Sequence, residues 1–286
     1  MKADLECFPC FLRQTVMALS YTNLEEREKI EIVRAVMDDV RDADLNEPPA
    51  YATSFIYRTI SKLSGLDPYA GIKKKCNSDA LTLYPLLRKR VLDCPDPLWA
   101  ASRLAMAGNI IDFGIFKSVD VESAIERAMR PSIEVDDYRS FASDVGGSKE
   151  ILYLLDNAGE IVLDRLLIEV LTEMGKTITA VVKGSPVIND ATMEDAEQAG
   201  IGTICRVIDN GTDAVGTILK FCGPPFLDEY LRHDLIVSKG QGNYETLAGK
   251  DKNIYFLFQA KCDVVSRDLG LELGAMLLKK NIPEGV

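Results

Sequence analysis

The chain of 286 residues is 47% hydrophobic and carries a formal net charge of −11, from 33 lysine and arginine residues against 44 aspartate and glutamate residues. A chain of this size can bury a substantial core, in one large domain or two smaller ones. The acidic balance argues against nucleic acid or an anionic membrane as the main partner, because both attract positive patches. A small phosphorylated substrate remains compatible, since a metal ion and a few cations can reverse the charge at one site.

No apolar run reaches the ~18 residues that a membrane-spanning helix needs, and the first residues lack the basic-then-apolar order of a signal peptide. We therefore expect a cytoplasmic protein whose seven cysteines are thiols or metal ligands rather than a disulfide framework. The single histidine, His233, excludes histidine-rich zinc centres and most Ser-His-Asp mechanisms. Its position just before a strand-like run predicts a surface or capping role.

The first half of the chain has the apolar spacing of amphipathic helices, and no strand alternation is convincing before about residue 148. Proline and glycine mark several of the helix ends, as at Pro48 and Gly65. The predicted helices cover residues 7–21, about 24–42, 51–63, about 68–94, 97–111 and 121–129.

The second half contains five short β-rich runs, each followed by a polar loop and then helical spacing or an acidic start. This order predicts an α/β fold: a Rossmann-like, doubly wound, mainly parallel sheet in the C-terminal half, with an all-helical N-terminal part. We expect domains at 1–140 and 141–286, with a boundary between about residues 130 and 148. The predicted strands are 151–155, 177–182, 203–208, 235–237 and 254–258.

Residues 150–164 read as a strand, a tight loop and a helix. The loop places Asp156 and Asn157 at the strand tip, Gly159 where the backbone can approach a ligand, and Glu160 in the first turn of the helix. Loops at the carboxyl ends of parallel strands are where α/β sheets bind ligands. Oxygen side chains there suit magnesium or manganese, and the helix amino terminus suits a phosphate.

Polar residues also follow the other four strands, and all would lie on one edge of a parallel sheet. Acids with an amide can hold a metal, lysines can neutralise phosphate charge, and the glycines on either side of Gln241 let backbone N–H groups approach an anion. A simple turn is the favoured interpretation for residues 209–211. The polar groups are residues 183–186 with 189–190, 209–211, 238–245 and 261–262.

Together these motifs resemble the damage-control phosphatases, which are metal-dependent phosphatases long catalogued as a domain of unknown function. The resemblance covers nearly the whole chain and is closest to a short prokaryotic and archaeal branch with an N-terminal Cys-x-x-Cys and a later Lys-Cys. The motifs are residues 7–10 (Cys-Phe-Pro-Cys), 156–160 (Asp-Asn-Ala-Gly-Glu), 183–192 (Lys-Gly-Ser-Pro-Val-Ile-Asn-Asp-Ala-Thr), 238–245 (Ser-Lys-Gly-Gln-Gly-Asn-Tyr-Glu) and 261–262 (Lys-Cys).

The resemblance implies that Asp156, Asn157 and Asp190 bind a divalent metal (magnesium, manganese, cobalt or nickel). It also implies that Lys261 and the loop amides hold the substrate phosphate, and that Asn109 reaches into the same cleft. A helix-ending amide satisfied by its own backbone is the alternative for Asn109. The full set of expected substrate or phosphate contacts is Asn109, Gly159, Lys183, Ser238, Lys239, Gly240 and Gly242.

A metal held by two carboxylates and an amide can polarise a phosphoryl oxygen and activate a bound water, while lysine charge stabilises the phosphoryl oxygens. The catalytic candidates are thus Asp156, Glu160 and Lys261. Ala158 stands where an aspartyl-phosphate phosphatase has its second aspartate, so we favour attack by water, with Asp156 as a metal ligand. Glu160 would orient the water or a ligand; alternatively it is a first-turn acid favoured by the helix dipole.

Cys7 and Cys10 have a spacing that lets two thiolates meet one metal or each other. Cys262 is the best third ligand for a second metal or redox site, because it follows the fifth strand. The alternative is that Cys7 and Cys10 are buried apolar helix residues.

Two other functions compete with a phosphatase of small phosphometabolites, such as sugar phosphates or damaged phosphorylated intermediates. One is a Rossmann-like carboxyl methyltransferase, although the first strand is followed by an acidic loop rather than a Gly-x-Gly-x-x-Gly cradle. The other is a non-catalytic protein that binds a metal or a phosphometabolite.

Overall fold

The computed structural model describes residues 1–108 and 133–283, and its centre is a seven-stranded sheet with the order β1-β7-β6-β5-β2-β3-β4. The strands from β6 to β4 in this order run parallel, whereas β7 is antiparallel to β6 and parallel to β1. The strand bounds are β1 (Val135–Asp136), β2 (Glu150–Leu154), β3 (Thr177–Val182), β4 (Arg206–Asp209), β5 (Leu235–Lys239), β6 (Asn253–Gln259) and β7 (Met276–Lys280).

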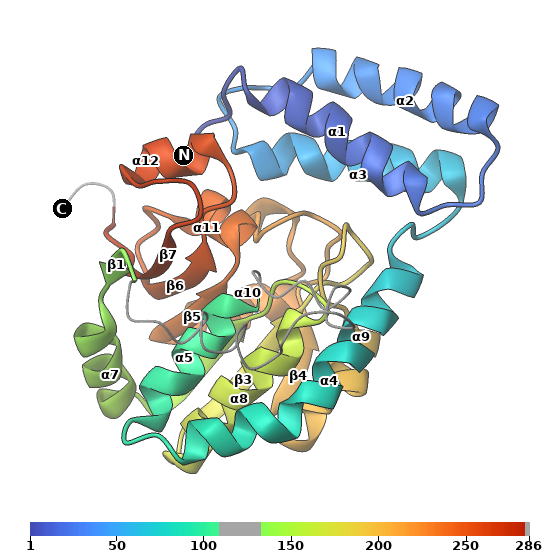
Figure 1. Cartoon of the computed structure of the whole chain (residues 1–286). Helices are drawn as coiled ribbons and strands as arrows, with labels where there is room; N and C mark the ends of the chain where they lie inside the picture. Colours follow the sequence, from blue (N-terminus) through green and yellow to red (C-terminus); the bar gives the residue numbers. More distant parts are fainter. Residues whose placement is uncertain (109–132, 284–286) are drawn as a thin grey trace.

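Helices cover both faces of the sheet (Figure 1). In β2, Ile151 and Tyr153 face one helix layer, and Leu152 and Leu154 face the other, as the two-residue period of a strand requires. The first layer consists of α4 (Ala70–Leu92), α5 (Pro97–Ala107), α7 (Tyr138–Gly147), α8 (Glu160–Glu173) and α9 (Met193–Ala199). The second consists of α10 (Pro224–Arg232), α11 (Gln241–Leu247) and α12 (Asp263–Leu269), and the 3-10 helices are Ile201–Thr203 and Leu219–Phe221.

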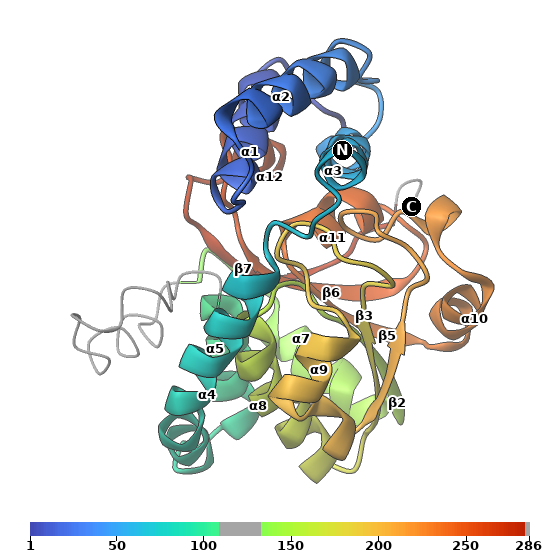
Figure 2. The same ribbon diagram turned by 90° about the vertical axis from the view of Figure 1, so that its right-hand side faces the viewer.

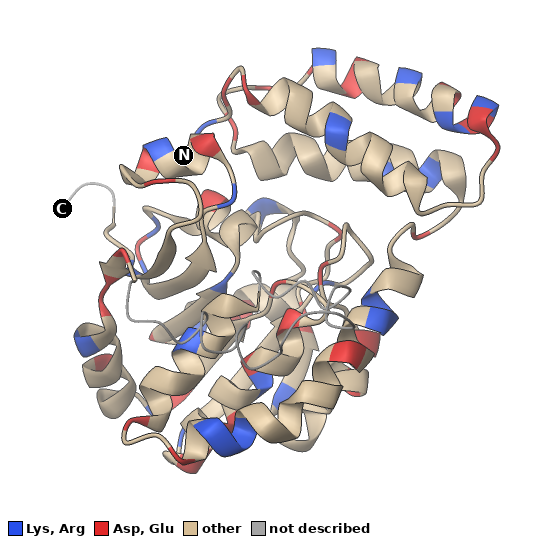
Figure 3. Cartoon of the chain, in the orientation of Figure 1, with Lys and Arg blue, Asp and Glu red and all other residues tan. Residues whose placement is uncertain are grey.

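The helices α1 (Cys7–Ser20), α2 (Glu26–Arg41) and α3 (Pro49–Ser64) pack together on the side of the sheet where its parallel strands end (Figure 2). A capping box formed by Glu25 and Glu28 starts α2. Pro49 occupies the first turn of α3, and Gly65, with φ of 67°, ends it. Figure 3 shows acidic and basic residues interspersed along the exposed sides of α2 and α4.

The expected fold class is confirmed, and each of the five predicted strands matches an observed one. The third prediction began too early, because residues 201–203 form a 3-10 helix and β4 starts only at Arg206. Neither β1 nor β7 was expected from the sequence. The predicted helix 121–129 lies outside the described residues.

The division at about residue 140 stays a prediction, but the packing groups the helices in another way. Buried residues of α4 and α5, such as Leu87 and Leu104, share one hydrophobic cluster with the sheet. The helices α1, α2 and α3 have a separate cluster, and it includes Val187 from the loop after β3.

His233 is the residue that caps α10, and its Nδ1 lies 2.8 Å from the carbonyl oxygen of Glu229. The capping role is confirmed, but the surface position was wrong, because His233 is only 2% exposed. Among residues 1–108 and 133–283, none of the helices combines the length and apolar character required to cross a membrane.

The sheet has a topological switch between β2 and β5. The chain moves outward from β2 through β3 to β4, and then returns to place β5 on the other side of β2. In open α/β sheets, ligands bind outside the carboxyl ends of the strands at such a point. The loops after β2 and β5 are therefore where the fold predicts a site.

Candidate active site

A short antiparallel bridge joins the loop after β2 to the loop after β3. It places Asn157 directly opposite Asp190. The bridge is closed by hydrogen bonds from Ala158 N to Asn189 O (2.9 Å) and from Ala191 N to Asp156 O (2.7 Å). The three expected metal ligands are thus held together by backbone pairing between two loops.

The loop that carries Asp190 is anchored in the helical part of the molecule. Val187 is buried in the cluster formed by α1, α2 and α3, and Ile188 packs against the same cluster. Ile188 has a φ of 46°, which a β-branched residue rarely adopts. Such backbone strain persists only where the surrounding structure enforces it, and it is common at functional sites.

Three carboxylates lie close together at this position. Burial raises the pKa of Asp156 well above its ordinary value, and the charges of Glu160 and Asp190 raise it further. Burial also raises the pKa of Asp190, although the nearby Lys183 opposes the change. A divalent cation would relieve this concentration of negative charge.

The donor set suits a hard cation that prefers oxygen ligands. Within the described part of the chain, no three histidine, cysteine, aspartate or glutamate side chains are arranged to hold a metal ion. The amide of Asn157 lies beside two of these carboxylates. The Nδ2 of Asn157 donates to Asp156 Oδ2 (2.6 Å) and to Glu160 Oε2 (3.3 Å).

Two glycines allow the loops to approach this closely. A Cβ atom at Gly240, which follows β5 with a φ of 80°, would lie 2.1 Å from the carboxyl carbon of Asp156. Gly159 also has a φ of 80°, and its N–H donates to Asn77 Oδ1 (2.6 Å). This N–H is therefore already hydrogen-bonded within the protein, although it was expected among the loop amides that bind the substrate phosphate.

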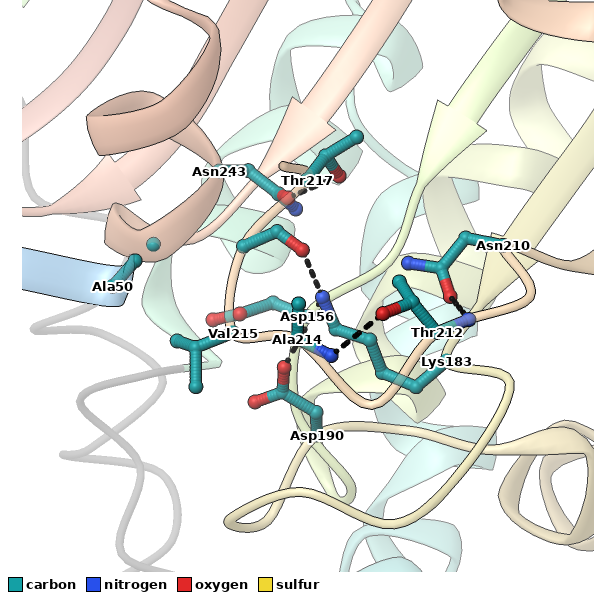
Figure 4. Close-up of polar contacts among 12 residues, drawn as sticks. Ala50, Asp156, Lys183, Asp190, Asn210, Thr212, Ala214, Val215, Thr217 and Asn243 are labelled. Atoms are coloured by element: carbon teal, nitrogen blue, oxygen red, sulfur yellow. Dashed lines mark hydrogen bonds and ion pairs between the residues drawn. The ribbon is translucent and has the colours of Figure 1, made fainter. Parts of the chain in front are cut away.

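The lysines expected at the site occupy different environments. Lys183 is buried, and its Nζ lies 3.4 Å from Asp190 Oδ2 and donates to the carbonyl oxygen of Gly216, as Figure 4 shows. Lys239 is fully buried against Glu160 and Asp164. Lys261 is exposed, and its charge lowers the pKa of Asp156.

The remaining expected phosphate contacts are Ser238, Gly242 and Asn109. Ser238 is fully buried within β5, and its hydroxyl has no hydrogen-bond partner among the described residues. Gly242 lies in α11, where an added Cβ would come within 3.3 Å of Gly216 N. Asn109 lies outside the described residues.

Several polar residues of the site were not expected from the sequence. Asn77 in α4 is fully buried and holds the Gly159 amide, while its Nδ2 donates to Asp195 Oδ1 (2.9 Å). Asn243 donates to Lys239 O (2.8 Å) and accepts from Thr217 Oγ1 (2.7 Å). A buried amide within a helix has no signature of its own in the sequence, so Asn77 could not have been found there, whereas Asn243 lies in the motif of residues 238–245 but was not singled out.

Residues 209–211 do form a turn, in which Gly211 N donates to Asp209 Oδ1 (2.8 Å). Asn210, however, also joins two loops. Its buried side chain, labelled in Figure 4, accepts from Gly184 N (3.1 Å) and Thr212 N (3.2 Å).

Cys7 and Cys10 lie in the first turn of α1, and Cys262 directly precedes α12. Cys7 is close enough to Cys10 and Cys262 for their charges to influence its pKa. The three thiols do not form a group arranged to hold a metal in the described residues. Cys7 is 6% exposed, and burial is the main cause that raises the pKa of its thiol. A redox role for the three stays a prediction.

Glu245 connects this region to α3. Its carboxylate accepts from Gln241 Nε2 (2.9 Å) and from Ala50 N (3.1 Å) at the start of α3, and it is 7% exposed. Burial raises the pKa of Glu245 to about 7, against the effect of these hydrogen bonds. The folded chain therefore binds this proton at higher pH than the unfolded chain does.

We expect Glu245→Gln to reduce the pH dependence of stability. Because the folded pKa is raised, the contribution of Glu245 is present in full below the unfolded pKa of about 4.3 and is lost as the pH rises through about 7. In the variant, the fall in the free energy of unfolding between pH 5 and pH 8 should shrink by about 1–3 kcal/mol. Urea unfolding at both pH values measures this, with the exposed Glu197→Gln as a control that keeps the wild-type difference. An unchanged difference in Glu245→Gln would contradict the assignment.

Comparisons with known proteins identify the family and confirm the fold. Residues 3–277 match the family model of the damage-control phosphatase ARMT1-like domain. A crystal structure of a DUF89 family protein from Pyrococcus horikoshii superposes with a TM-score of 0.92 at 30% identity, covering 99% of this chain and 100% of that chain.

The curated relatives match over most of their length. An uncharacterized protein of Methanocaldococcus jannaschii is 37% identical, over 98% of this chain and 96% of its own. A damage-control phosphatase of Pyrococcus horikoshii is 33% identical, over 98% and 99%. A damage-control phosphatase of Archaeoglobus fulgidus is 35% identical, over 80% and 82%. The chain therefore belongs to the ARMT1-like, or DUF89, family of damage-control phosphatases.

Proposed function

We propose that the protein is a metal-dependent phosphatase that hydrolyses small phosphometabolites, such as sugar phosphates or damaged phosphorylated intermediates. The observation that carries the proposal is the pairing of Asn157 with Asp190, beside Asp156, at the switch between β2 and β5. Family membership supports the phosphatase class.

Asp156, Asn157 and Asp190 would hold a divalent metal such as magnesium, manganese, cobalt or nickel, because their oxygens are the ligands that such ions accept. When bound, the metal supplies polarisation of a phosphoryl oxygen and a water molecule of lowered pKa. The raised pKa of Asp156 in the metal-free protein fits this role, since the site favours positive charge.

The other site residues act on the substrate and on the ligands. Lys261 is exposed next to Asp156 and would neutralise the phosphoryl oxygens during transfer. Glu160 is only 1% exposed and contacts the Asn157 amide, which favours a role in orienting that ligand over direct contact with substrate. Lys183 neutralises part of the charge of Asp190.

We propose attack by water rather than by a carboxylate. Ala158 occupies the position two residues after Asp156, where an aspartyl-phosphate mechanism needs a second carboxylate, and its side chain is buried. Asp156 would then act only as a ligand: the water oxygen would form a bond to phosphorus as the ester P–O bond breaks, releasing the alcohol and inorganic phosphate.

Phosphate release from p-nitrophenyl phosphate tests the proposal. We expect metal-stripped protein to be inactive, and added magnesium, manganese, cobalt or nickel to restore turnover. If no metal restores turnover while the protein still binds manganese, a non-catalytic binding role becomes the better explanation. If methyl transfer from S-adenosylmethionine is observed instead, the methyltransferase alternative is correct.

A further inference from the structure

We infer that Lys239 is a positioning residue that sets the orientation of the Asn157 amide through Glu160, rather than a ligand of the substrate phosphate. The inference rests on the proposed metal site, and it assigns a role to a buried ion cluster formed by Lys239, Glu160 and Asp164.

The ammonium of Lys239 is enclosed by three acceptors. Its Nζ lies 2.5 Å from Glu160 Oε1, 2.7 Å from Asp164 Oδ1 and 2.8 Å from the carbonyl oxygen of Ala105. The side chains of the three charged residues are at most 1% exposed. A lysine has three donor hydrogens, so these contacts use its full capacity and leave none for a phosphate.

The two carboxylate oxygens of Glu160 have different partners. Oε1 accepts from Lys239, and Oε2 accepts from Asn157 Nδ2. Asn157 Nδ2 also donates to Asp156 Oδ2. The amide nitrogen is thus turned toward two carboxylates, which directs the amide oxygen, the atom that can bind a cation, to the opposite side.

Lys239 is needed because it is the cation that contacts Glu160 in this enclosed position, where a carboxylate without a partner is costly. Without the ammonium, Oε1 of Glu160 would lose this contact, and the side chain could turn away from Asn157. The amide nitrogen would then lose one of its two acceptors, and the amide could rotate.

The cluster also fixes the elements that carry it. Glu160 and Asp164 lie one turn apart in α8, Lys239 ends β5, and Ala105 lies in the last turn of α5. Tyr153 in β2 donates to Asp164 Oδ1 (2.8 Å). At Gly108 an added Cβ would lie 2.7 Å from Glu160 Cγ, so the end of α5 closes directly over this side chain. Glu160 therefore has little freedom to adopt another position.

To test the inference, the Mn²⁺ affinities of the full-length Lys239→Met and Glu160→Gln variants are measured by electron paramagnetic resonance and compared with that of the wild type. We expect each variant to bind Mn²⁺ at least about 10-fold more weakly, as loss of a group behind a metal ligand usually does. The matched control is Arg165→Met, which removes a half-buried ion pair with Glu169 (3.0 Å) from the same helix without contacting Asn157. It should lower stability and leave Mn²⁺ affinity unchanged.

The outcomes separate this inference from the proposed function. Wild-type affinity in folded Lys239→Met and Glu160→Gln would overturn it while leaving the metal site intact. If Lys239→Met does not fold, Glu160→Gln decides, because its Lys239 keeps Asp164 as a partner. If the wild-type protein does not bind Mn²⁺, both the inference and the proposed function are overturned. If the wild-type protein binds Mn²⁺ but has no phosphatase turnover, and the variants bind Mn²⁺ more weakly, the inference is supported and the proposed function is overturned.

Discussion

Replacing Asp156 with asparagine is expected to abolish metal-dependent turnover and, at the same time, to stabilise the metal-free protein at pH 8. The loss follows from removal of a ligand. Even changes behind a ligand weaken metal binding about 10- to 100-fold, so we expect a decrease of more than about 100-fold for Asp156→Asn. The gain in stability follows from charge. The folded protein holds Asp156 with a raised pKa, because burial, Glu160 and Asp190 all disfavour its ionised form.

The sign of the stability change can be derived from the proton balance. A carboxyl whose folded pKa is raised loses stability as the pH rises from the unfolded pKa through the folded one, and asparagine has no such charge. Urea unfolding in the presence of a chelator measures the gain, and a Mn²⁺ titration measures the loss. Asp209→Asn is the control, because Asp209 lies at the same sheet edge but is exposed in a turn. A destabilised variant that still binds metal would contradict the assignment.

The second large effect is expected for Gly240→Ala. The new methyl group would overlap the Asp156 carboxylate, since its Cβ would lie 2.1 Å from Cγ and 2.1 Å from Oδ2. The φ of 80° is in addition unfavourable for alanine, and backbone strain of this kind costs about 1–3 kcal/mol before the overlap is counted. We expect a lower free energy of unfolding and loss of metal-dependent turnover, because Asp156 has to move.

The control for this experiment is Gly146→Ala in α7. No atom lies within 4 Å of the added Cβ there, and the helical backbone suits alanine, which is favoured over glycine by up to about 1 kcal/mol. Unfolding curves and kcat with saturating metal distinguish the two substitutions. Normal activity in Gly240→Ala would show that Asp156 does not need its present position.

The parts of the fold that the sequence could predict are the ones with strong local patterns. The strands β2, β3, β5 and β6 are buried on both faces and read as continuous apolar runs, as parallel strands do. In β7 only the first three residues are buried, and the strand ends in two lysines, so its pattern is weak. With two residues, β1 is too short to leave a pattern.

The site was predictable to the level of its loops but not of every side chain. The order of motifs placed Asp156, Asn157 and Asp190 at one sheet edge, and the bridge between their loops agrees with that expectation. The buried position of the Lys239 side chain was harder to predict, because a lysine beside a glycine in a loop is also typical of a phosphate contact. The spacing of charged residues in the strand and the helix did, however, indicate it.

That signal combines a strand and a helix. Lys239 shares the strand face of Leu235 and Val237, which pack under the layer that contains α8. Glu160 and Asp164 are four residues apart in that helix, among apolar neighbours, and thus face the same way. A buried cation could have been paired with these two acids, but which sheet face α8 covers depends on tertiary structure.

The anchoring of Val187 and Ile188 in the cluster of α1, α2 and α3 has a mechanical consequence. A helix bundle whose core is completed by a loop from elsewhere cannot move as an independent lid, because any displacement of the bundle pulls on the segment that carries Asp190. We therefore expect opening of the bundle and displacement of the loop that carries Asp190 to belong to one cooperative unit of local unfolding. Substitutions on the distant surface of α1 or α2 that destabilise this unit should then weaken the proposed metal site without contacting it directly.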